Sequence, residues 1–179
     1  MLDLYHFIWV VFLKGKRYLK FYWNHLQLGH PQIWGRKMDK ALSYDDVLLV
    51  KPETYMNNSG VSVQSILAYY KLLPKQFGLI RKKGIDLTNF LTVVHDEKDI
   101  EIGKYKISLD SRSAGHRGVE SIINNLKTQN FKRIRIGIKS QLLERMAIKD
   151  FVLKKFAINE MALADAAIEE AIKKELKVM

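Results

Sequence analysis

Cysteine is absent from the 179 residues of this chain, which excludes disulfide bridges and thiolate metal sites and suits a reducing cytoplasm. Long apolar runs are absent as well. The longest near the N-terminus, residues 7–13 (FIWVVFL), is far shorter than the roughly 20 residues that a membrane-spanning helix needs. Basic residues follow this run instead of preceding it, which is the reverse of a signal peptide. We therefore expect a cytoplasmic protein that does not insert into a membrane.

Acidic residues are scarce relative to basic ones. The chain has 30 Lys and Arg against 19 Asp and Glu, so its formal net charge is +11. This excess favours a polyanionic partner, because neutralisation of phosphates drives sequence-independent binding to nucleic acids. A basic protein without such a partner remains the alternative. The length, and a hydrophobic content of 47%, fit one domain with an ordinary core.

Apolar periodicity predicts strands that alternate with helices, and no internal repeat interrupts them. The expected elements are, in chain order, a strand at 47–50, a helix at 61–73, strands at 90–94 and 104–109, a helix at 119–126, a strand at 133–138 and a helix from 159 onward. The inner stripe of the last helix should consist of Met161, Ala164, Ile168 and Ile172. This alternation indicates a single α/β domain.

Residues 51–60, KPETYMNNSG, join the first of these strands to the first helix. Pro52 should end the strand because it has no N–H for a sheet ladder, and Asn58 to Gly60 are typical of a helix start. Amides, a hydroxyl and an aromatic ring are thus placed at the carboxyl end of a strand, where ligands bind in open α/β sheets. A strand, a turn and a capped helix without a ligand would give the same pattern.

Other polar stretches also leave alternatives open. Residues 95–99, HDEKD, follow an apolar strand and form either a solvated turn or a site. Residues 133–138, RIRIGI, alternate with period two and predict a strand with one basic face. Residues 16–25, KRYLKFYWNH, could stack on bases and pair with phosphates, or cover the edge of the core with lysine stems.

Three blocks together resemble bacterial peptidyl-tRNA hydrolases, over about residues 37–179. Residues 51–60 resemble the signature Lys-Pro-x-Thr-Tyr/Phe-Met-Asn-x-Ser-Gly of that family, and residues 93–99 (VVHDEKD) its Val-x-His/Tyr-Asp-Asp/Glu-x-Asp segment. Residues 113–123 (SAGHRGVESII) and 131–138 (FKRIRIGI) resemble its Gly-Gly-His-Asn-Gly-x-x-Ser-Ile and Phe-x-Arg-x-Arg-Ile-Gly-Ile blocks. The resemblance implies an α/β domain with a mixed, twisted β-sheet flanked by helices.

The resemblance also implies an activity, which is cleavage of the ester between a peptidyl group and the 3′ end of tRNA. In this family a His acts as general base on water, an Asp orients it, and Asn side chains hold the substrate and the oxyanion. By position, Asp96 matches the orienting Asp and Asn57 the substrate-binding Asn. Tyr55, His116 and Arg135 match positions that contact the substrate or the tRNA. The implied enzyme needs no cofactor and no metal, and is a monomer whose partner is peptidyl-tRNA.

The chain departs from the family at its N-terminus. The family's opening strand and Gly-Leu-Gly-Asn-Pro-Gly turn have no match, so residues 1–35 form a divergent segment before the family-like domain at 36–179, and a missing central strand would expose a sheet edge. His6 is the candidate base, since its separation from Asn57 is close to the family's and the following WVVFL resembles the family's first helix. His25 and His30 have no such support. Arg117 replaces an Asn and could hold a phosphate or carbonyl oxygen, but it cannot accept a hydrogen bond.

Three hypotheses therefore stand at the level of the sequence. The first is a peptidyl-tRNA hydrolase that uses His6, Asp96 and Asn57, whose gene model begins late or carries a frameshift. The second is a catalytically impaired, tRNA-binding member of the same fold. The third is an unrelated basic α/β domain that binds a protein partner.

Overall fold

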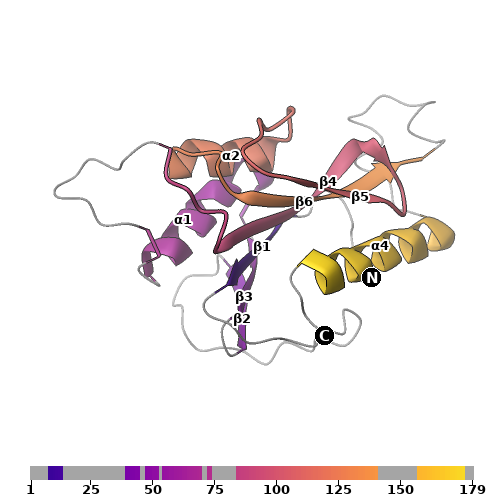
Figure 1. Ribbon diagram of the computed structural model, residues 1–179, viewed down its shortest axis with the longest axis horizontal. Coiled ribbons are helices and arrows are strands. Elements are labelled where there is room, and N and C mark those ends of the chain that lie inside the picture. Colours follow the sequence, from indigo (N-terminus) through magenta and orange to yellow (C-terminus); the bar gives the residue numbers. More distant parts are fainter. Residues whose placement is uncertain are drawn as a thin grey trace.

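The computed structural model describes residues 8–13, 39–44, 47–52, 54–69, 72–73, 84–140 and 157–175 (Figure 1). His6, His25 and His30 lie outside these residues. The described strands are β1 (Ile8–Leu13), β2 (Asp39–Tyr44), β3 (Val47–Pro52), β4 (Leu91–Glu101), β5 (Tyr105–Ser108) and β6 (Lys132–Lys139). The described helices are the 3₁₀ turn η1 (Met56–Asn58), α1 (Ser59–Tyr69), α2 (Arg117–Leu126) and α4 (Ile158–Glu175). None of these helices is both long and apolar enough to cross a membrane.

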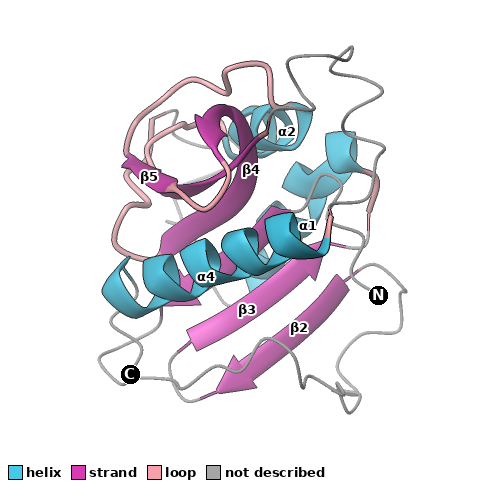
Figure 2. Cartoon of the chain, turned by 90° about the vertical axis from the view of Figure 1, so that its right-hand side faces the viewer, coloured by secondary structure: helices cyan, strands magenta, loops and turns pink. Residues whose placement is uncertain are grey.

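The described strands form one sheet in the order β2-β3-β1-β4-β6-β5. β4 and β6 pair in parallel, and every other neighbouring pair is antiparallel. Helices α1 and α2 lie together over one face of the sheet, and α4 lies over the other face against β6 and β5 (Figures 1 and 2). The expected fold class, an α/β domain with a mixed sheet flanked by helices, is confirmed.

The main core lies between the helix pair α1 and α2 and the sheet. It consists of buried aliphatic and aromatic side chains from α1, α2, β4 and the segments before β4 and β6: Val63, Ile66, Leu67, Leu87, Leu91, Val93, Ile122, Leu126 and Phe131. Gly60 allows the two helices to touch, because a Cβ at that position would lie 2.1 Å from the backbone oxygen of Ser121. The backbone N–H of Gly60 also donates to Ser121 Oγ at 3.0 Å. The start of α1 is therefore fixed on α2.

The helical predictions are largely confirmed, with shifted edges. α1 begins two residues earlier than expected, since the turn η1 leads directly into it, and it ends at Tyr69, before Pro74. In α4 the buried residues are Ala164, Ala167, Ile168 and Ala171, whereas Met161 and Ile172 are only half-buried. The inner face of α4 is thus made mostly of alanines, which are small enough to let the helix approach the sheet closely.

Residues 9–13, which resemble the family's first helix in sequence, do not form a helix. Residues Ile8–Leu13 form strand β1, which pairs with β3 on one side and β4 on the other. In the register of the sheet, Val10 lies opposite Val50 of β3 and Val93 of β4. Valine, isoleucine and aromatic residues favour such a central, doubly paired strand. A strand therefore fills the centre of the sheet, where the sequence suggested that one was missing.

Strand β4 is longer than the predicted strand at residues 90–94. It continues to Glu101 because β6 pairs with it in parallel as far as Glu97, beyond which the register shifts. Gly137 makes the close approach at this shift possible, since a Cβ there would lie 2.1 Å from the backbone oxygen of Glu101. The polar residues from His95 to Glu97 are consequently part of the strand and are buried, which excludes a solvated turn.

Candidate active site

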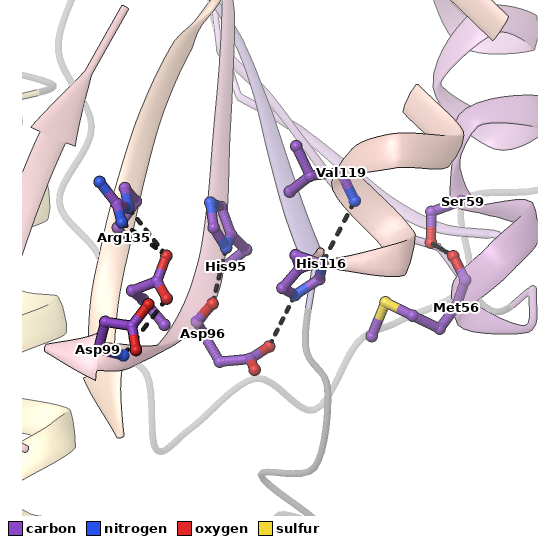
Figure 3. Close-up of polar contacts among 9 residues, drawn as sticks. Met56, Ser59, His95, Asp96, Asp99, His116, Val119 and Arg135 are labelled. Atoms are coloured by element: carbon purple, nitrogen blue, oxygen red, sulfur yellow. Dashed lines mark hydrogen bonds and ion pairs between the residues drawn. The ribbon is translucent and has the colours of Figure 1, made fainter. Parts of the chain in front are cut away.

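Three consecutive ionisable residues of β4 are buried. His95 is 1% exposed, and Asp96 and Glu97 are each 6% exposed. Groups of this kind are rarely buried without partners, because the loss of hydration must be compensated by hydrogen bonds or opposite charge. Each of the three has such a partner in the structure (Figure 3).

Asp96 is hydrogen-bonded to His116, with 3.0 Å between Oδ1 of Asp96 and Nε2 of His116. Both side chains are largely buried, at 7% and 10% exposure. His116 is also the N-cap of α2, where its Nδ1 accepts the backbone N–H of Val119 at 3.2 Å. An accepting Nδ1 carries no proton, so the ring is the neutral tautomer whose Nε2–H donates to Asp96. The carboxylate is thus tied to the first turn of a helix.

A tight reversal of the chain brings His116 to this place. Ala114 and Gly115 precede it with φ angles of 50° and 81°, and the N–H of His116 donates to the carbonyl oxygen of Ser113 at 3.0 Å. Glycine adopts this left-handed conformation without cost, whereas alanine does not. The small residues of this segment therefore serve to turn the chain sharply before the helix.

His95 is placed as a structural residue. Its Nδ1–H donates to the carbonyl oxygen of Asp96 at 2.7 Å, and its ring meets the ring of His116 edge-on with 4.7 Å between centroids. Burial, and secondarily the neighbouring His116, lower the pKa of His95 to about 3. The ring is therefore neutral near pH 7, and its depth keeps it from water. This arrangement makes His95 unsuited to act as a general base.

The Tyr55–Gly60 motif divides into an inner and an outer set of residues. Met56 packs partly against the core, and the hydroxyl of Ser59 donates to the carbonyl oxygen of Met56 at 2.9 Å (Figure 3). Tyr55, by contrast, is 82% exposed, and Asn57 is exposed too. η1, which carries both residues or adjoins them, contacts α2, the helix whose N-cap is His116.

The two predicted arginines are in different surroundings. Arg117 is the first residue of α2 and is exposed. Arg135 on β6 is 27% exposed and forms an ion pair with Glu97, whose Oε2 lies 2.8 Å from Nη2 of Arg135. The expected basic face of β6 is therefore partly neutralised, and its other arginine, Arg133, is only 2% exposed.

The structure thus brings Asp96 and His116 into contact and places η1, with Tyr55 and Asn57, beside α2. His6 falls outside the described residues, so its place in the site stays a prediction. The ion pair of Glu97 with Arg135 was not predicted, although an acidic residue after an apolar strand and two arginines in another expected strand could have indicated it. Among the described residues, no three His, Asp or Glu side chains are grouped as a metal site would require.

Comparisons with known proteins identify the family. The family model described as peptidyl-tRNA hydrolase matches residues 24–179. Curated peptidyl-tRNA hydrolases of Mesoplasma florum and Mycoplasma capricolum are 43% identical over 98 residues and 50% identical over 92 residues, which is 55% and 51% of this chain. These matches cover 45% and 42% of the relatives, so the chain spans about half the length of the curated relatives it matches.

A solved structure is similar as well. The crystal structure of peptidyl-tRNA hydrolase from Acinetobacter baumannii superimposes with a TM-score of 0.56 at 31% identity. The superposition covers 76% of this chain and 62% of that one. The matched region of the family model includes the segments that carry Asn57, Asp96, His116 and Arg135.

Proposed function

The chain belongs to the peptidyl-tRNA hydrolase family, and on that premise we propose that it hydrolyses the ester bond between a peptidyl, or other N-blocked aminoacyl, group and tRNA. The observation that carries this proposal is the buried Asp96 carboxylate, which His116 fixes in place at the N-terminus of α2, the helix that also contacts η1. The activity would recycle tRNA from prematurely released peptidyl-tRNA. The net charge of +11 supports a polyanionic substrate.

Hydrolysis of an ester requires a base that activates water and donors that stabilise the tetrahedral oxyanion. We assign the role of oxyanion donor to the side-chain amide of Asn57, which is exposed in η1, just before α1. The two histidines of the described site are poor bases, since His95 is buried and both ring nitrogens of His116 are hydrogen-bonded. The base is therefore sought elsewhere. His6 remains the proposed residue on its separation from Asn57 alone, since residues 9–13 form part of β1 instead of a helix and the match to the family model begins at residue 24.

Asp96 has the proposed role of orienting the base. A carboxylate has two oxygens that can each accept more than one hydrogen bond. His116 engages Oδ1, which fixes the rotamer of Asp96 and so the direction in which the carboxylate acts. In this proposal His116 supports the site through Asp96, which replaces the expectation that its ring nitrogens bind the substrate.

Binding of the tRNA is assigned to the exposed residues around this centre. Tyr55 offers an aromatic face on which a base or the peptidyl group can stack. Arg117, at the first turn of α2, and Arg135, at the surface of β6, are proposed to contact phosphate or carbonyl oxygens. In the proposal the enzyme acts as a cytoplasmic monomer without metal or cofactor.

The test is release of an N-blocked amino acid from tRNA by the 179-residue chain and four variants. Asp96→Asn and His6→Ala should each lower kcat by about 10²- to 10⁴-fold, because each removes a part of base catalysis. Asn57→Ala should lower kcat by about 10²- to 10³-fold through loss of an oxyanion donor. The control is Asp99→Asn, an exposed carboxylate on the same strand, which should keep full activity.

A parent chain that binds tRNA but releases no amino acid would contradict the proposal and favour the impaired, tRNA-binding alternative. An active His6→Ala variant would contradict only the assignment of the base. Equal losses in Asp96→Asn and Asp99→Asn would show that charge, not the Asp96–His116 contact, is what matters.

A further inference from the structure

Glu97 is a buried carboxylate with fixed donors on both oxygens. Its side chain is 6% exposed, in the middle of the sheet pair β4 and β6. Oε2 accepts Nε–H and Nη2–H of Arg135 at 3.0 and 2.8 Å, and Oε1 accepts the backbone N–H of Asp99 at 3.3 Å (Figure 3). The carboxylate therefore has one orientation, and Arg135 is held against it by two hydrogen bonds.

Arg135 uses only one edge of its guanidinium for this contact. The group has five N–H donors, of which Glu97 engages one on Nε and one on Nη2. No other hydrogen bond joins the guanidinium to the described residues. The outer edge, formed by Nη1 and the second hydrogen of Nη2, belongs to a side chain that is 27% exposed. A fork of N–H groups on such an edge matches two oxygens of a phosphate.

Arg133 supplies the positive charge that the ion pair lacks. Glu97 offsets the charge of Arg135. Arg133, two residues earlier on the same strand, is buried, and the charges of both Arg135 and Glu97 act on its guanidinium. Its Nη1–H donates to the carbonyl oxygen of Arg112 at 3.0 Å. Burial, and then the charge of Arg135, lower the pKa of Arg133 to about 10, so it is still protonated near pH 7. The cluster of Arg133, Arg135 and Glu97 is thus positive.

We propose that Glu97 is a positioning residue for tRNA binding, which holds the guanidinium of Arg135 so that its outer edge meets a phosphate of the tRNA backbone. This inference rests on the proposed function and deepens it. Glu97 itself touches no substrate. A lysine at position 135 could not be held in the same way, because an ammonium has no planar edge that divides between a carboxylate and a phosphate.

The direction in which one substitution changes the affinity for tRNA distinguishes a positioning role of Glu97 from an effect of its charge alone. Glu97→Gln removes a negative charge from a basic surface, so electrostatics alone predict tighter binding of a polyanion. Positioning predicts the opposite. A glutamine amide has only one oxygen, so its N–H group must face either Arg135 or the backbone N–H of Asp99, and the charge that holds the guanidinium is lost. Glu97→Asp keeps the charge and shortens the side chain by one methylene, so it tests the geometry by itself.

The experiment measures binding of tRNA to the 179-residue chain over a series of salt concentrations. Arg135→Gln should weaken binding by about tenfold and reduce the slope of log Kd against log salt by about 1, since one phosphate contact is lost. Glu97→Gln and Glu97→Asp should each weaken binding by about three- to tenfold. In hydrolysis assays these variants should raise KM and leave kcat near that of the parent.

Two further variants complete the design. In the Arg135→Gln background, Glu97→Gln should cause no additional loss, because its effect acts through Arg135. Glu101→Gln removes an exposed carboxylate of the same strand, one that pairs with Lys104, and should bind tRNA as well as the parent or better. Thermal unfolding of every variant shows whether it is folded. If Glu97→Gln is not folded, the binding measured for Glu97→Asp decides the inference.

Parent-like or tighter binding by the folded Glu97 variants would overturn the inference, as would a full additional loss in the Arg135→Gln background. Failure of the proposed function looks different. A parent chain that does not bind tRNA overturns both proposals, whereas a parent that binds and hydrolyses while the Glu97 variants remain normal overturns only this one.

Discussion

Strand β4 is buried from Leu91 to Glu97, and the two halves of this stretch are buried for different reasons. From Leu91 to Val94 the side chains are apolar or nearly so and pack into the core beside α1 and α2. From His95 to Glu97 they are ionisable. Side chains from elsewhere in the chain pair with Asp96 and Glu97, whereas Nδ1 of His95 bonds the neighbouring carbonyl oxygen of Asp96. Asp96 is paired with a residue 20 positions away, and Glu97 with one 38 positions away. The first half needs only a core, whereas the second needs two particular side chains.

The largest change in stability is expected from a charge placed in the apolar half of this stretch. Val93→Asp should destabilise the fold by about 4 kcal/mol or more, because Val93 is fully buried in the apolar core and a carboxylate there would lose its hydration. Chemical denaturation measures the change. Val93→Ala is the control and should cost about 2 kcal/mol from lost packing alone. Equal costs for the two variants would show that this half of β4 tolerates charge.

Removal of a partner tests the polar half. His116→Ala should destabilise by about 2 to 3 kcal/mol, because it removes both the N-cap of α2 and a hydrogen bond to the buried Asp96. His116→Asn restores a capping side chain but is too short to reach Asp96, so it should recover about 1 kcal/mol of that loss. If both variants are equally stable, the cap contributes nothing measurable.

A third prediction compares the halves through pH. The pKa of His95 is lowered to about 3 in the folded chain, from 6.5, mainly by burial. Between these two pKa values, the unfolded chain therefore binds a proton at His95 that the folded chain does not bind. The contribution of His95 to stability is complete above about pH 6.5 and is lost as the pH falls toward 3, with a slope of about 1.4 kcal/mol per pH unit from this residue alone.

Denaturation of the parent and of His95→Tyr between pH 7 and pH 4 measures that slope. Tyrosine does not titrate in this range, and it is the alternative to histidine at this position of the family's sequence pattern. The difference in stability between parent and variant should change with pH by the stated amount. A constant difference would mean that the folded and unfolded chains bind this proton equally well, contrary to the lowered pKa of His95 in the folded chain.

Periodicity predicts the elements that have one polar and one apolar face. For example, Val119, Ile122 and Leu126 mark the buried side of α2 as expected. It fails where an element is apolar on both sides. Residues 9–13 are short and uniformly apolar, so the sequence does not distinguish helix from strand, and only pairing with β3 and β4 settles the matter.

The motif blocks predict candidate site residues, but not the contacts between them. The motif blocks identify Asn57, Asp96 and His116, yet no spacing along the chain reveals that Asp96 and His116 touch across a strand and a turn. The extent of β4 was missed for the same reason. Charged residues normally end a buried strand, and here they continue it only because His116 and Arg135 arrive from distant elements.

Gly60 has a consequence for how function can be lost in this protein. Any side chain at that position would collide with the backbone of α2 at Ser121 and push the start of α1 outward, and Asn57 would move with it. A genetic screen for inactive variants would therefore rank Gly60 beside Asp96, although glycine has no group that could take part in the reaction. Substitutions at Gly60 should be read as errors of alignment between two helices. A change of side chain at Ser121 would not relieve the collision, because the atoms met there belong to the backbone, so a compensating change is best sought at Asn125, whose side-chain Nδ2 is the third nearest atom.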